Sequence, residues 1–363
     1  MKIIHFATMS GKDYSGVSLI VPEYIKHQSF YCEEILVNCN TKVKYNNNKI
    51  ETINLSCKSD ILKLFNDVTK PDLVIIHEIY NPIYLDIVNF LLKNNIPYVL
   101  VPHGGLTKHA QIISWYKKII GNILLFNKVI KNAIAIQYLS KNEAKQSIIN
   151  KRYIICGNGF EVKTDKRYYV KQREKFKITY IGRLDPYHKG LDVLIESCKT
   201  IKSYMKENNI IIYICGPDYK NQERKLHKLI NKYDLNEIVK IKSAMYNEDK
   251  IDFLLDSDLF VQTSRLEGQP LSLIEALKLG IPIIVTPGTT FSDIVKEANC
   301  GYAVDFNKYS IAEVIIKSHK QRKELLNLSM NAIKVSKNIF EWGDITKNTL
   351  RCYYELIGKR FYK

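Results

Sequence analysis

Two glutamates eight positions apart, Glu267 and Glu275, stand in the segment SRLEGQPLSLIEALKLGIPIIVT, directly after the strand-like run LFVQT. Pro270 suits the first turn of a helix, where backbone amides lack intrahelical partners. The amides presented in this way would be those of Gly268, Gln269 and Leu271. Carboxylates and amides together can hold the hydroxyls of a sugar or a ribose. Spacing alone permits another interpretation, in which Glu275 pairs with Lys278 on a helix surface.

A second set of polar residues follows a strand pattern in YIGRLDPYHKG, residues 180–190. The strand ends at Gly182, and Arg183 and Lys189 follow in the loop before the next helix. Two cations at the carboxyl end of a buried strand can neutralise a diphosphate, Arg by bidentate bonding and Lys as a point charge. A solvated loop in a lysine-rich chain is the alternative. His188, beside the two cations, is interpreted as structural.

Glycine-containing turns follow two more strand patterns. MSGKDYSGVS, residues 9–18, contains Gly11 and Gly16, so its amides can approach a phosphate closely, and Ser18 is placed to cap the next helix. VPHGGL puts His103 at the end of a strand beside two glycines. The alternatives are an ordinary strand–helix loop for the first turn and a buried, hydrogen-bonded histidine for the second.

Short β-branched runs alternate with segments of helical period along the whole chain. This alternation is typical of parallel sheets covered by helices on both faces, the doubly wound α/β class. The predicted strands are 3–7, 73–77, 98–101, 133–138, 153–156, 177–181, 210–215, 238–242, 259–262 and 283–286. The predicted helices include 191–205, 222–232, 248–255 and 271–279. Ligands of such sheets bind outside the carboxyl ends of the strands, where all these polar residues stand.

Both halves of the chain show the alternation, which predicts two Rossmann-like domains rather than one long sheet. The boundary is placed in the polar stretch EVKTDKRYYVKQREKF, which lacks apolar periodicity. The expected domains are 1–165 and 166–340, followed by a C-terminal helix within 341–363.

Composition limits the class of protein further. A chain of 363 residues with 46% hydrophobic and 25% charged residues can bury two cores and is not disordered. The eight cysteines show no C-x-x-C spacing, which favours reduced thiols and a cytoplasmic location. No secretory signal pattern opens the sequence and no apolar run is long enough to span a bilayer, so an integral membrane protein is not expected.

Together these motifs resemble glycosyltransferase family 4, retaining nucleotide-sugar enzymes of the GT-B fold, and among them enzymes that assemble bacterial capsule or O-antigen polysaccharides. The matching pieces, in chain order, are SGVS, PHGGL, GRLDPYHKG, ICGPD and EGQPLSLIE with ALKLGIPIIVT after it. FEWGDITKNTLRCYYEL is similar to the family's final helix, which returns to the first domain. The resemblance implies an acceptor-binding N-terminal domain and a donor-binding C-terminal domain that face a cleft.

The resemblance also implies a role for each site residue. Arg183 and Lys189 would bind the donor diphosphate, with amides near Gly16 closing on it from the other domain. Glu275 would bind the ribose hydroxyls. One departure concerns the glycine turn, because the family often has paired glycines where this chain has Ser15-Gly16.

His103 and Glu267 are the catalytic residues that the resemblance implies. His103 would lie beside the transferring sugar, bonding it and helping to stabilise charge. Glu267 would hold the sugar hydroxyls, together with the segment Gly268, Gln269, Pro270 and Leu271.

The implied reaction moves a hexosyl sugar from a UDP- or GDP-sugar to a glycan or an undecaprenyl-diphosphate-linked glycan, with retention of configuration. Breaking the glycosyl–phosphate bond leaves negative charge on the diphosphate, which fixed cations and helix amides stabilise. Retention is usually assigned in this family to attack from the leaving-group face. The nucleotide sugar is a co-substrate, and no metal or other cofactor is expected to be required.

One motif points elsewhere. Asp256-Ser257-Asp258 matches the D-x-D by which another fold class of glycosyltransferases binds a divalent metal with a nucleotide. Here it ends a helix and enters a buried strand at the amino end, away from the expected ligand edge. We interpret it as a feature of helix end and strand entry.

Positive charge is concentrated in one part of the first domain. The net charge is +17, and residues 108–152 hold nine lysines and arginines against one acid, Glu143. Within this stretch Ile112, Ile113, Tyr116, Ile119, Ile120, Ile123 and Leu124 recur at helical spacing, with Lys117, Lys118 and Lys128 on another side. One hypothesis places this face on anionic lipid at the inner side of the cytoplasmic membrane, near a lipid-diphosphate acceptor. The other is a core-packed helix with a solvated basic face.

Two further functions compete with glycosyl transfer. A sugar-nucleotide epimerase or a phosphorylase could share this architecture, and epimerised donor or phosphorolysis without acceptor would identify it. A nucleic-acid-binding protein would use the charge, but the chain has no recognition motif, zinc site or aromatic ribonucleoprotein pattern. No nucleic-acid partner is therefore expected.

Overall fold

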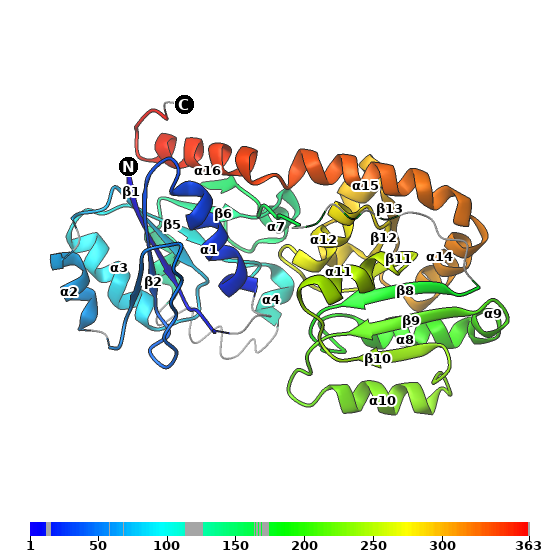
Figure 1. The fold of residues 1–363 in the computed structure, drawn as a ribbon. Coiled ribbons are helices and arrows are strands. Elements are labelled where there is room, and N and C mark those ends of the chain that lie inside the picture. Colours follow the sequence, from blue (N-terminus) through cyan, green and yellow to red (C-terminus); the bar gives the residue numbers. More distant parts are fainter. Residues whose placement is uncertain are drawn as a thin grey trace. The chain divides into compact units, whose positions relative to one another are not determined.

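The computed structural model describes residues 1–11, 16–57, 59–67, 69–112, 126–162, 164, 166, 168 and 174–361. The chain forms two compact units (Figure 1). Unit 1 comprises Met1–Gly159 and Trp342–Lys363, and unit 2 comprises Phe160–Glu341. The boundary falls just before the polar stretch in which the sequence placed it. The reason is that the start of this stretch is hydrogen-bonded to the backbone of unit 2. The amides of Phe160 and Tyr168 donate to the carbonyls of Phe340 and Leu279, at 3.0 and 2.9 Å.

Unit 1 is built on a parallel sheet with the strand order β3-β2-β1-β4-β5-β6-β7. Its strands are β1 (Lys2–Ala7), β2 (Glu33–Asn38), β3 (Thr52–Asn54), β4 (Leu73–His77), β5 (Tyr98–Val101), β6 (Ala135–Tyr138) and β7 (Tyr153–Ile155). The chain runs outward from β1 to β3, then returns to β4 on the other side of β1. The direction of winding therefore changes between β1 and β4, which is where such sheets bind ligands.

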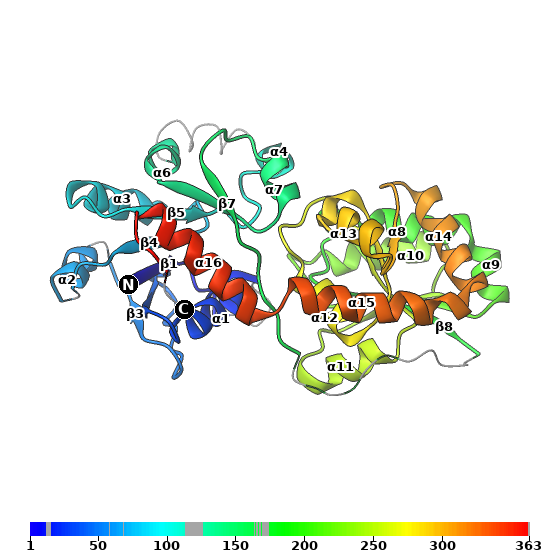
Figure 2. The same cartoon turned by 90° about the horizontal axis from the view of Figure 1, so that it is seen from above.

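Helices cover both faces of this sheet. They are α1 (Gly16–Gln28), α2 (Asp60–Asp67), α3 (Ile83–Lys93), α4 (Lys108–Ile112), α6 (Asn127–Asn132), α7 (Lys141–Gln146) and α16 (Trp342–Leu356). One core includes Phe6, Val74 and Leu91 of α3. On the opposite face, Ile75 and Val99 pack with Leu350 and Tyr353 of α16, so the last helix belongs to this unit (Figure 2).

Unit 2 repeats the architecture with the order β10-β9-β8-β11-β12-β13, again all parallel. Its strands are β8 (Phe176–Ile181), β9 (Ile210–Cys215), β10 (Val239–Lys242), β11 (Leu259–Gln262), β12 (Ile283–Val285) and β13 (Gly301–Ala303). Its helices are α8 (Leu191–Thr200), α9 (Lys202–Glu207), α10 (Glu223–Lys232), α11 (Asn247–Leu255), α12 (Leu271–Leu279), α13 (Ser292–Ala298), α14 (Lys308–Lys320), α15 (Leu325–Ile339) and the 3-10 turns η2 (Pro287–Thr289) and η3 (Arg322–Glu324). Here the winding reverses between β8 and β11.

The doubly wound α/β class is confirmed in both units, and all ten predicted strands are present with bounds within two residues. The predicted helix 191–205 is divided, because Ile201 leaves helical geometry at φ −118°, ψ 26°. Three strands had no counterpart in the prediction, namely β2, β3 and β13. Within the described ranges, no helix combines the length and the hydropathy that crossing a membrane requires.

We expect Gly190→Ala to destabilise unit 2. Gly190 has φ of +64°, and a Cβ there would lie 1.9 Å from the Thr263 carbonyl oxygen. Left-handed strain and this collision should together lower the free energy of unfolding by at least ~2 kcal/mol, measured by scanning calorimetry. Gly16→Ala is the control, because a Cβ at Gly16 meets nothing within 4 Å. Equal stability of the two variants would contradict the close approach.

Candidate functional site

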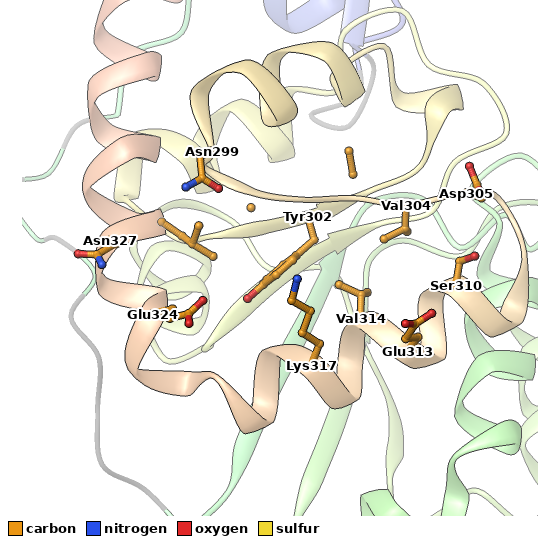
Figure 3. Close-up of a pocket in the computed structure, with 13 residues that line it drawn as sticks. Asn299, Tyr302, Val304, Asp305, Ser310, Glu313, Val314, Lys317, Glu324 and Asn327 are labelled. Carbon is orange, nitrogen blue, oxygen red and sulfur yellow. The ribbon is translucent and has the colours of Figure 1, made fainter.

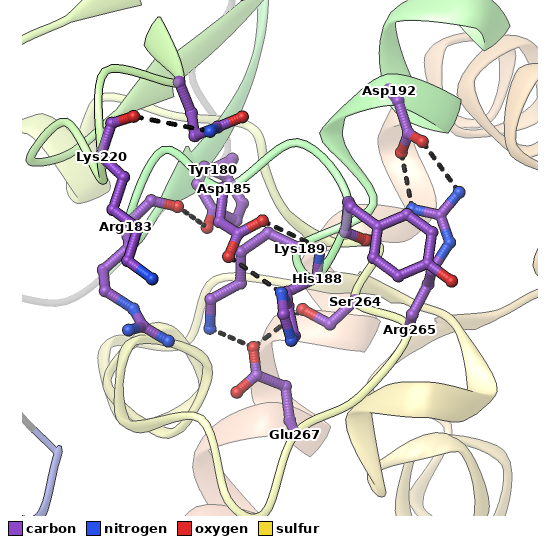
Figure 4. Close-up of polar contacts among 12 residues, drawn as sticks. Tyr180, Arg183, Asp185, His188, Lys189, Asp192, Lys220, Ser264, Arg265 and Glu267 are labelled. Carbon is purple, nitrogen blue, oxygen red and sulfur yellow. Dashed lines mark hydrogen bonds and ion pairs between the residues drawn. The ribbon is translucent and has the colours of Figure 1, made fainter. Parts of the chain in front are cut away.

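In unit 2, two loops meet at the carboxyl edge of the sheet, where the winding reverses between β8 and β11. The Thr263 hydroxyl donates to the carbonyls of Lys189 and Gly190, at 3.2 and 3.1 Å. The Arg265 amide donates to the His188 carbonyl at 2.9 Å. The Arg265 guanidinium then forms a bidentate pair with Asp192 of α8, with both N–O distances 2.8 Å (Figure 4). These contacts hold the loop after β8 and the loop after β11 as one surface.

The centre of this surface is an ion pair between Lys189 and Glu267, two residues predicted for the site. Their side chains are only 14% and 13% exposed, so the pair is largely shielded from solvent. The same carboxylate oxygen, Oε1, accepts the Ser264 hydroxyl at 2.8 Å (Figure 4). It also accepts the Gln262 amide at 3.2 Å. Within the described residues, Oε2 of Glu267 takes part in no hydrogen bond, which leaves it able to accept a ligand hydroxyl.

Arg183 stands in the same loop as Lys189, and the two side chains extend in the same direction in Figure 4. Its guanidinium carbon lies 4.7 Å from the centre of the Tyr219 ring, in the segment after β9. The Tyr180 hydroxyl donates to the Arg183 carbonyl at 3.0 Å and fixes the backbone. Among the described residues the guanidinium forms no ion pair, so a cation oriented by an aromatic face remains available for an anion.

The start of α12 presents backbone amides on the same loop. Pro270 is the N-cap residue, at φ −72° and ψ 111°, one position before the first helical residue. The Glu267 amide donates to the Gly288 carbonyl at 2.8 Å, and the Gly268 carbonyl accepts the Thr290 hydroxyl at 2.8 Å. These bonds fix the loop while leaving the amides of Gly268 and Leu271 without an acceptor in the described part of the chain. Such amides can bind anions or hydroxyl oxygens.

Glu275 is buried in the second turn of α12, with 5% of its surface exposed. Its carboxylate lies 2.8 Å from Lys250 of α11, whereas Lys278 pairs with Glu341 at 2.7 Å. The interpretation of Glu275 as a surface partner of Lys278 is therefore wrong. Burial raises the pKa of Glu275, and the attraction of Lys250 opposes that rise.

In unit 1, two non-glycine residues with positive φ end adjacent strands. His103, after β5, has φ 47°, and Glu78, after β4, has φ 68°. Such strained backbone often marks functional positions. His103 Nε2 lies 3.0 Å from His77 Nδ1, and burial lowers the pKa of His103 to about 4. Burial raises the pKa of Glu78 to about 7. Burial therefore favours the uncharged form of both side chains, His103 and Glu78.

The loop that carries His103 is fixed by Glu143 of α7. This fully buried carboxylate accepts the amide of Gly104 at 2.6 Å and that of Leu139 at 2.7 Å. Burial raises the pKa of Glu143 to about 7, although the two amide bonds lower it. The single acid of the basic stretch is thus a structural anchor for the PHGGL turn.

Gly16 is the first residue of α1 and is exposed. Ser18 is not a cap, because it lies inside the helix and its hydroxyl accepts the Ser10 amide at 2.9 Å. The intervening residues 12–15 lie outside the described part of the chain. The phosphate contact expected near Gly16 therefore remains a prediction.

The D-x-D motif lies at the opposite edge of the unit 2 sheet. Asp256 ends α11 and pairs with Lys177, and Asp258 precedes β11. Asp258 accepts the Lys177 amide at 2.8 Å and pairs with Arg322 at 2.8 Å. Its interpretation as a helix-end and strand-entry feature is confirmed. His188, which we interpreted as structural, has its Nδ1 3.0 Å from Asp185 in its own loop.

The sequence motifs did not reveal several residues of these sites. Glu275 is paired with Lys250 of another helix, and Arg183 lies against Tyr219 of another loop. Arg265 is paired with Asp192 of α8. Glu78 had a usable signal, since it is an acid directly after a buried strand next to the strand of His103.

A separate hollow of about 690 Å³ lies in unit 2 beside β13 and α14 (Figure 3). Tyr302, Lys317, Glu313 and Asn327 are among the residues that line it. None of the predicted site residues does so. This hollow therefore differs from the candidate site at the β8–β11 edge.

Comparison with known proteins identifies the family. Residues 161–335 match the family described as glycosyl transferases group 1. The uncharacterized glycosyltransferase MJ1059 of Methanocaldococcus jannaschii is 30% identical over 280 residues, which cover 71% of this chain and 66% of that protein. A putative colanic acid biosynthesis glycosyltransferase of Salmonella typhimurium, WcaL, is 30% identical over 125 residues, 33% of this chain and 30% of that protein. These matches span less than two thirds of the relatives' own length.

The fold is similar to that of Anabaena HepE, solved in complex with UDP-glucose, at a TM-score of 0.75 and 16% identity. That similarity covers 98% of this chain and 100% of HepE. The chain belongs to the group 1 glycosyl transferases and has the GT-B fold. The resemblance drawn from the sequence motifs is confirmed at this level.

The pKa of Glu78 leads to a prediction of pH-dependent stability. Its folded value of about 7 exceeds the ordinary value of 4.5, so the folded protein holds this proton more tightly than the unfolded chain. The associated stability is present below about pH 4.5 and is lost as the pH rises through about 7. Glu78→Gln removes the loss, and the variant should exceed wild type by ~2–3 kcal/mol above that window.

Urea titrations between pH 4.5 and 8 measure this difference. Glu51→Gln is the matched control, because Glu51 is an exposed glutamate of the same unit. A difference between Glu78→Gln and wild type that stays constant over the whole range would contradict the raised pKa of Glu78.

Proposed function

We propose that the protein is a retaining glycosyltransferase that moves a hexosyl sugar from a nucleotide diphosphate, UDP or GDP, to a glycan or lipid-linked glycan. The observation that carries the proposal is the surface at the β8–β11 edge. It combines the aromatic-oriented Arg183, the shielded Lys189–Glu267 pair and the amides at the start of α12. Family membership supports glycosyl transfer as its chemistry.

The proposed division of work follows the charges. Arg183 and Lys189 offset the charge that develops on the departing diphosphate, which is the main electrostatic demand of the reaction. Oε1 of Glu267 already contacts Lys189, Ser264 and Gln262, so Oε2 is the oxygen that accepts a sugar hydroxyl. The buried Glu275 accepts ribose hydroxyls while Lys250 keeps its charge balanced.

His103 is proposed to contact the transferring sugar, and amides near Gly16 to contact the diphosphate. Attack from the leaving-group face, with the departing phosphate taking the acceptor's proton, accounts for retention without a separate protein base. A role in envelope polysaccharide assembly is supported by the similarity to the colanic acid relative WcaL. We propose no metal or other cofactor for this reaction.

A thermal-shift screen of UDP, GDP and their sugars tests the proposal. At least one should raise the melting temperature of wild type, because a ligand that binds only the folded state stabilises it. Arg183→Ala and Glu275→Gln should each weaken the apparent affinity for that nucleotide at least ~10-fold, which corresponds to about 1.4 kcal/mol of binding free energy. The thermal shift of each variant should therefore be smaller than that of wild type. Arg224→Ala, an exposed arginine of α10, is the control and should respond as wild type.

Two outcomes would contradict this assignment. One is that no nucleotide stabilises the wild-type protein. The other is that both site variants respond to a stabilising nucleotide as fully as the control. Epimerised donor as the reaction product would instead favour the epimerase alternative, and phosphorolysis without acceptor would favour the phosphorylase.

We further propose that the basic stretch 108–152 rests on an anionic membrane that holds the acceptor. Residues 113–125, which include most of the predicted amphipathic segment, lie outside the described part of the chain. The described part supports the proposal through exposed cations and neighbouring exposed apolar side chains. The cations are Lys128, Lys131, Lys141, Lys145 and Arg152, and the apolar side chains are Ile148, Tyr153 and Ile155.

Co-sedimentation at low salt tests the membrane proposal. Phosphatidylglycerol vesicles should bind the protein, and phosphatidylcholine vesicles should not. Replacing Lys141, Lys145 and Arg152 with Gln should weaken binding at least ~10-fold, since each cation contributes about 1 kcal/mol near an anionic surface. The matched control replaces three exposed cations of α10, Arg224, Lys225 and Lys228. Wild type that stays in the supernatant with both lipids would exclude the proposal.

A further inference from the structure

A line of three imidazoles crosses the unit 1 sheet. His5 lies on β1, His77 ends β4 and His103 follows β5, and these three strands are neighbours in the sheet. His5 Nδ1 is 2.9 Å from His77 Nε2, and His77 Nδ1 is 3.0 Å from His103 Nε2. Adjacent rings are 5.3 Å apart in both pairs and nearly parallel. The three rings therefore form one hydrogen-bonded chain.

A carboxylate ends this chain on the inner side. Glu34 Oε2, on β2, lies 2.8 Å from His5 Nε2. Both side chains are at most 1% exposed. The other oxygen, Oε1, accepts the Cys32 thiol at 3.0 Å. Burial, reinforced by the charge of Glu34, raises the pKa of Cys32, so the thiol keeps its proton and remains a donor.

The rings of His77 and His103 are neutral at neutral pH. Burial, then the neighbouring imidazoles of His5 and His103, lower the pKa of His77 well below its ordinary value. Burial lowers the pKa of His103 to about 4. A neutral imidazole has one N–H donor and one lone-pair acceptor. A chain of such rings therefore has a direction, and the group at its inner end sets that direction.

Glu34 sets the direction outward. The proposal takes His5 to carry one hydrogen. A lone pair on its Nε2 would then lie 2.8 Å from a carboxylate oxygen and be repelled, so Nε2 carries that hydrogen. His5 Nδ1 must then accept from His77 Nε2, and His77 Nδ1 must accept from His103 Nε2. The ring atom left over is Nδ1 of His103, which carries a lone pair.

We propose that Glu34, His5 and His77 are positioning residues that fix His103 as the Nε2–H tautomer, so that its Nδ1 accepts a hydrogen bond from a hydroxyl of the donor sugar. The identification of that hydroxyl rests on the proposed function, whereas the tautomer does not. An imidazole fixed in this way discriminates between partners, because it accepts from a hydroxyl and cannot donate to the diphosphate. The arrangement also holds the ring against rotation at the strained turn.

Burial of these groups supports a specific role. On the same sheet face Ile3, Leu73, Ile75 and Val101 are apolar and buried, as is usual for central parallel strands. Polar groups placed among them cost stability unless they are fully hydrogen-bonded. The chain of rings begins at a buried carboxylate and reaches its single partly exposed member at His103. His103, at the carboxyl edge of the sheet, is therefore the ring that a ligand can contact.

Nitrogen NMR of protein labelled with ¹⁵N-histidine tests the tautomer without any substrate. Wild type at pH 7 should show His103 as a single Nε2–H tautomer, assigned by its loss in His103→Gln. In Glu34→Gln, the uncharged amide can face His5 with either its oxygen or its NH₂ group, so His103 should become a mixture of tautomers. His77→Gln breaks the chain at another point and should have the same effect. Glu33→Gln is the matched control, since Glu33 is the exposed neighbour of Glu34 on β2.

Two results of this experiment would overturn the proposal. The first is a hydrogen on Nδ1 of His103 in wild type, which would mean that the chain runs inward. The second is an unchanged His103 tautomer in both Glu34→Gln and His77→Gln. A merely structural role of Glu34 predicts the second result, with lower stability alone.

Binding of UDP and UDP-glucose then tests the hydroxyl. Glu34→Gln should weaken binding of UDP-glucose at least 5-fold and leave binding of UDP unchanged, because the proposed partner of His103 is a hydroxyl of the sugar, which UDP lacks. Equal weakening of both ligands, or of neither, would overturn the contact with the sugar. If wild type binds neither ligand while its tautomer is as expected, the choice of donor fails and the positioning chain stands.

Discussion

Lys189 and Glu267 come from loops that follow different strands, β8 and β11, and their ion pair joins the two loops where the winding of the unit 2 sheet reverses. A shielded pair of this kind is stable only if the remaining lone pairs and protons find partners. Ser264 and Gln262 provide them for one oxygen of Glu267. Arg183 and the start of α12 lie in the same two loops, where Tyr219, Gly288 and Thr290 hold them, so a polar ligand meets groups that are already in place.

The fold was predictable because its buried strands are long apolar runs bounded by loops. β4, β5, β9 and β11 lie where the sequence placed them. The strands that escaped prediction lack such a run. β3 reads TIN and β13 reads GYA, so each has only one large apolar residue. β2 begins with two glutamates, and the second, Glu34, is buried beside His5. α8 and α9 share one helical period in the sequence, and only the backbone of Ile201 separates them.

The site was predictable in part, for a related reason. Arg183, Lys189 and Glu267 each follow a strand, and the class of sheet brings strand ends together. Their partners depend on side-chain contacts between distant segments, which no local spacing encodes. Lys250 and Glu275 belong to different helices, and Glu34, His5, His77 and His103 come from four segments of unit 1. Spacing even suggested the wrong partner, Lys278, for Glu275.

A crystal structure of the protein with UDP tests the central claim most directly, namely that the β8–β11 edge of unit 2 holds the nucleotide diphosphate. The account predicts that the diphosphate contacts Arg183 and Lys189 and that the ribose hydroxyls lie on Glu275. The pair between Lys189 and Glu267 should persist or exchange its lysine contact for phosphate. A nucleotide bound elsewhere, for example in the hollow beside Tyr302, with no contact to Arg183 or Glu275, would contradict the account.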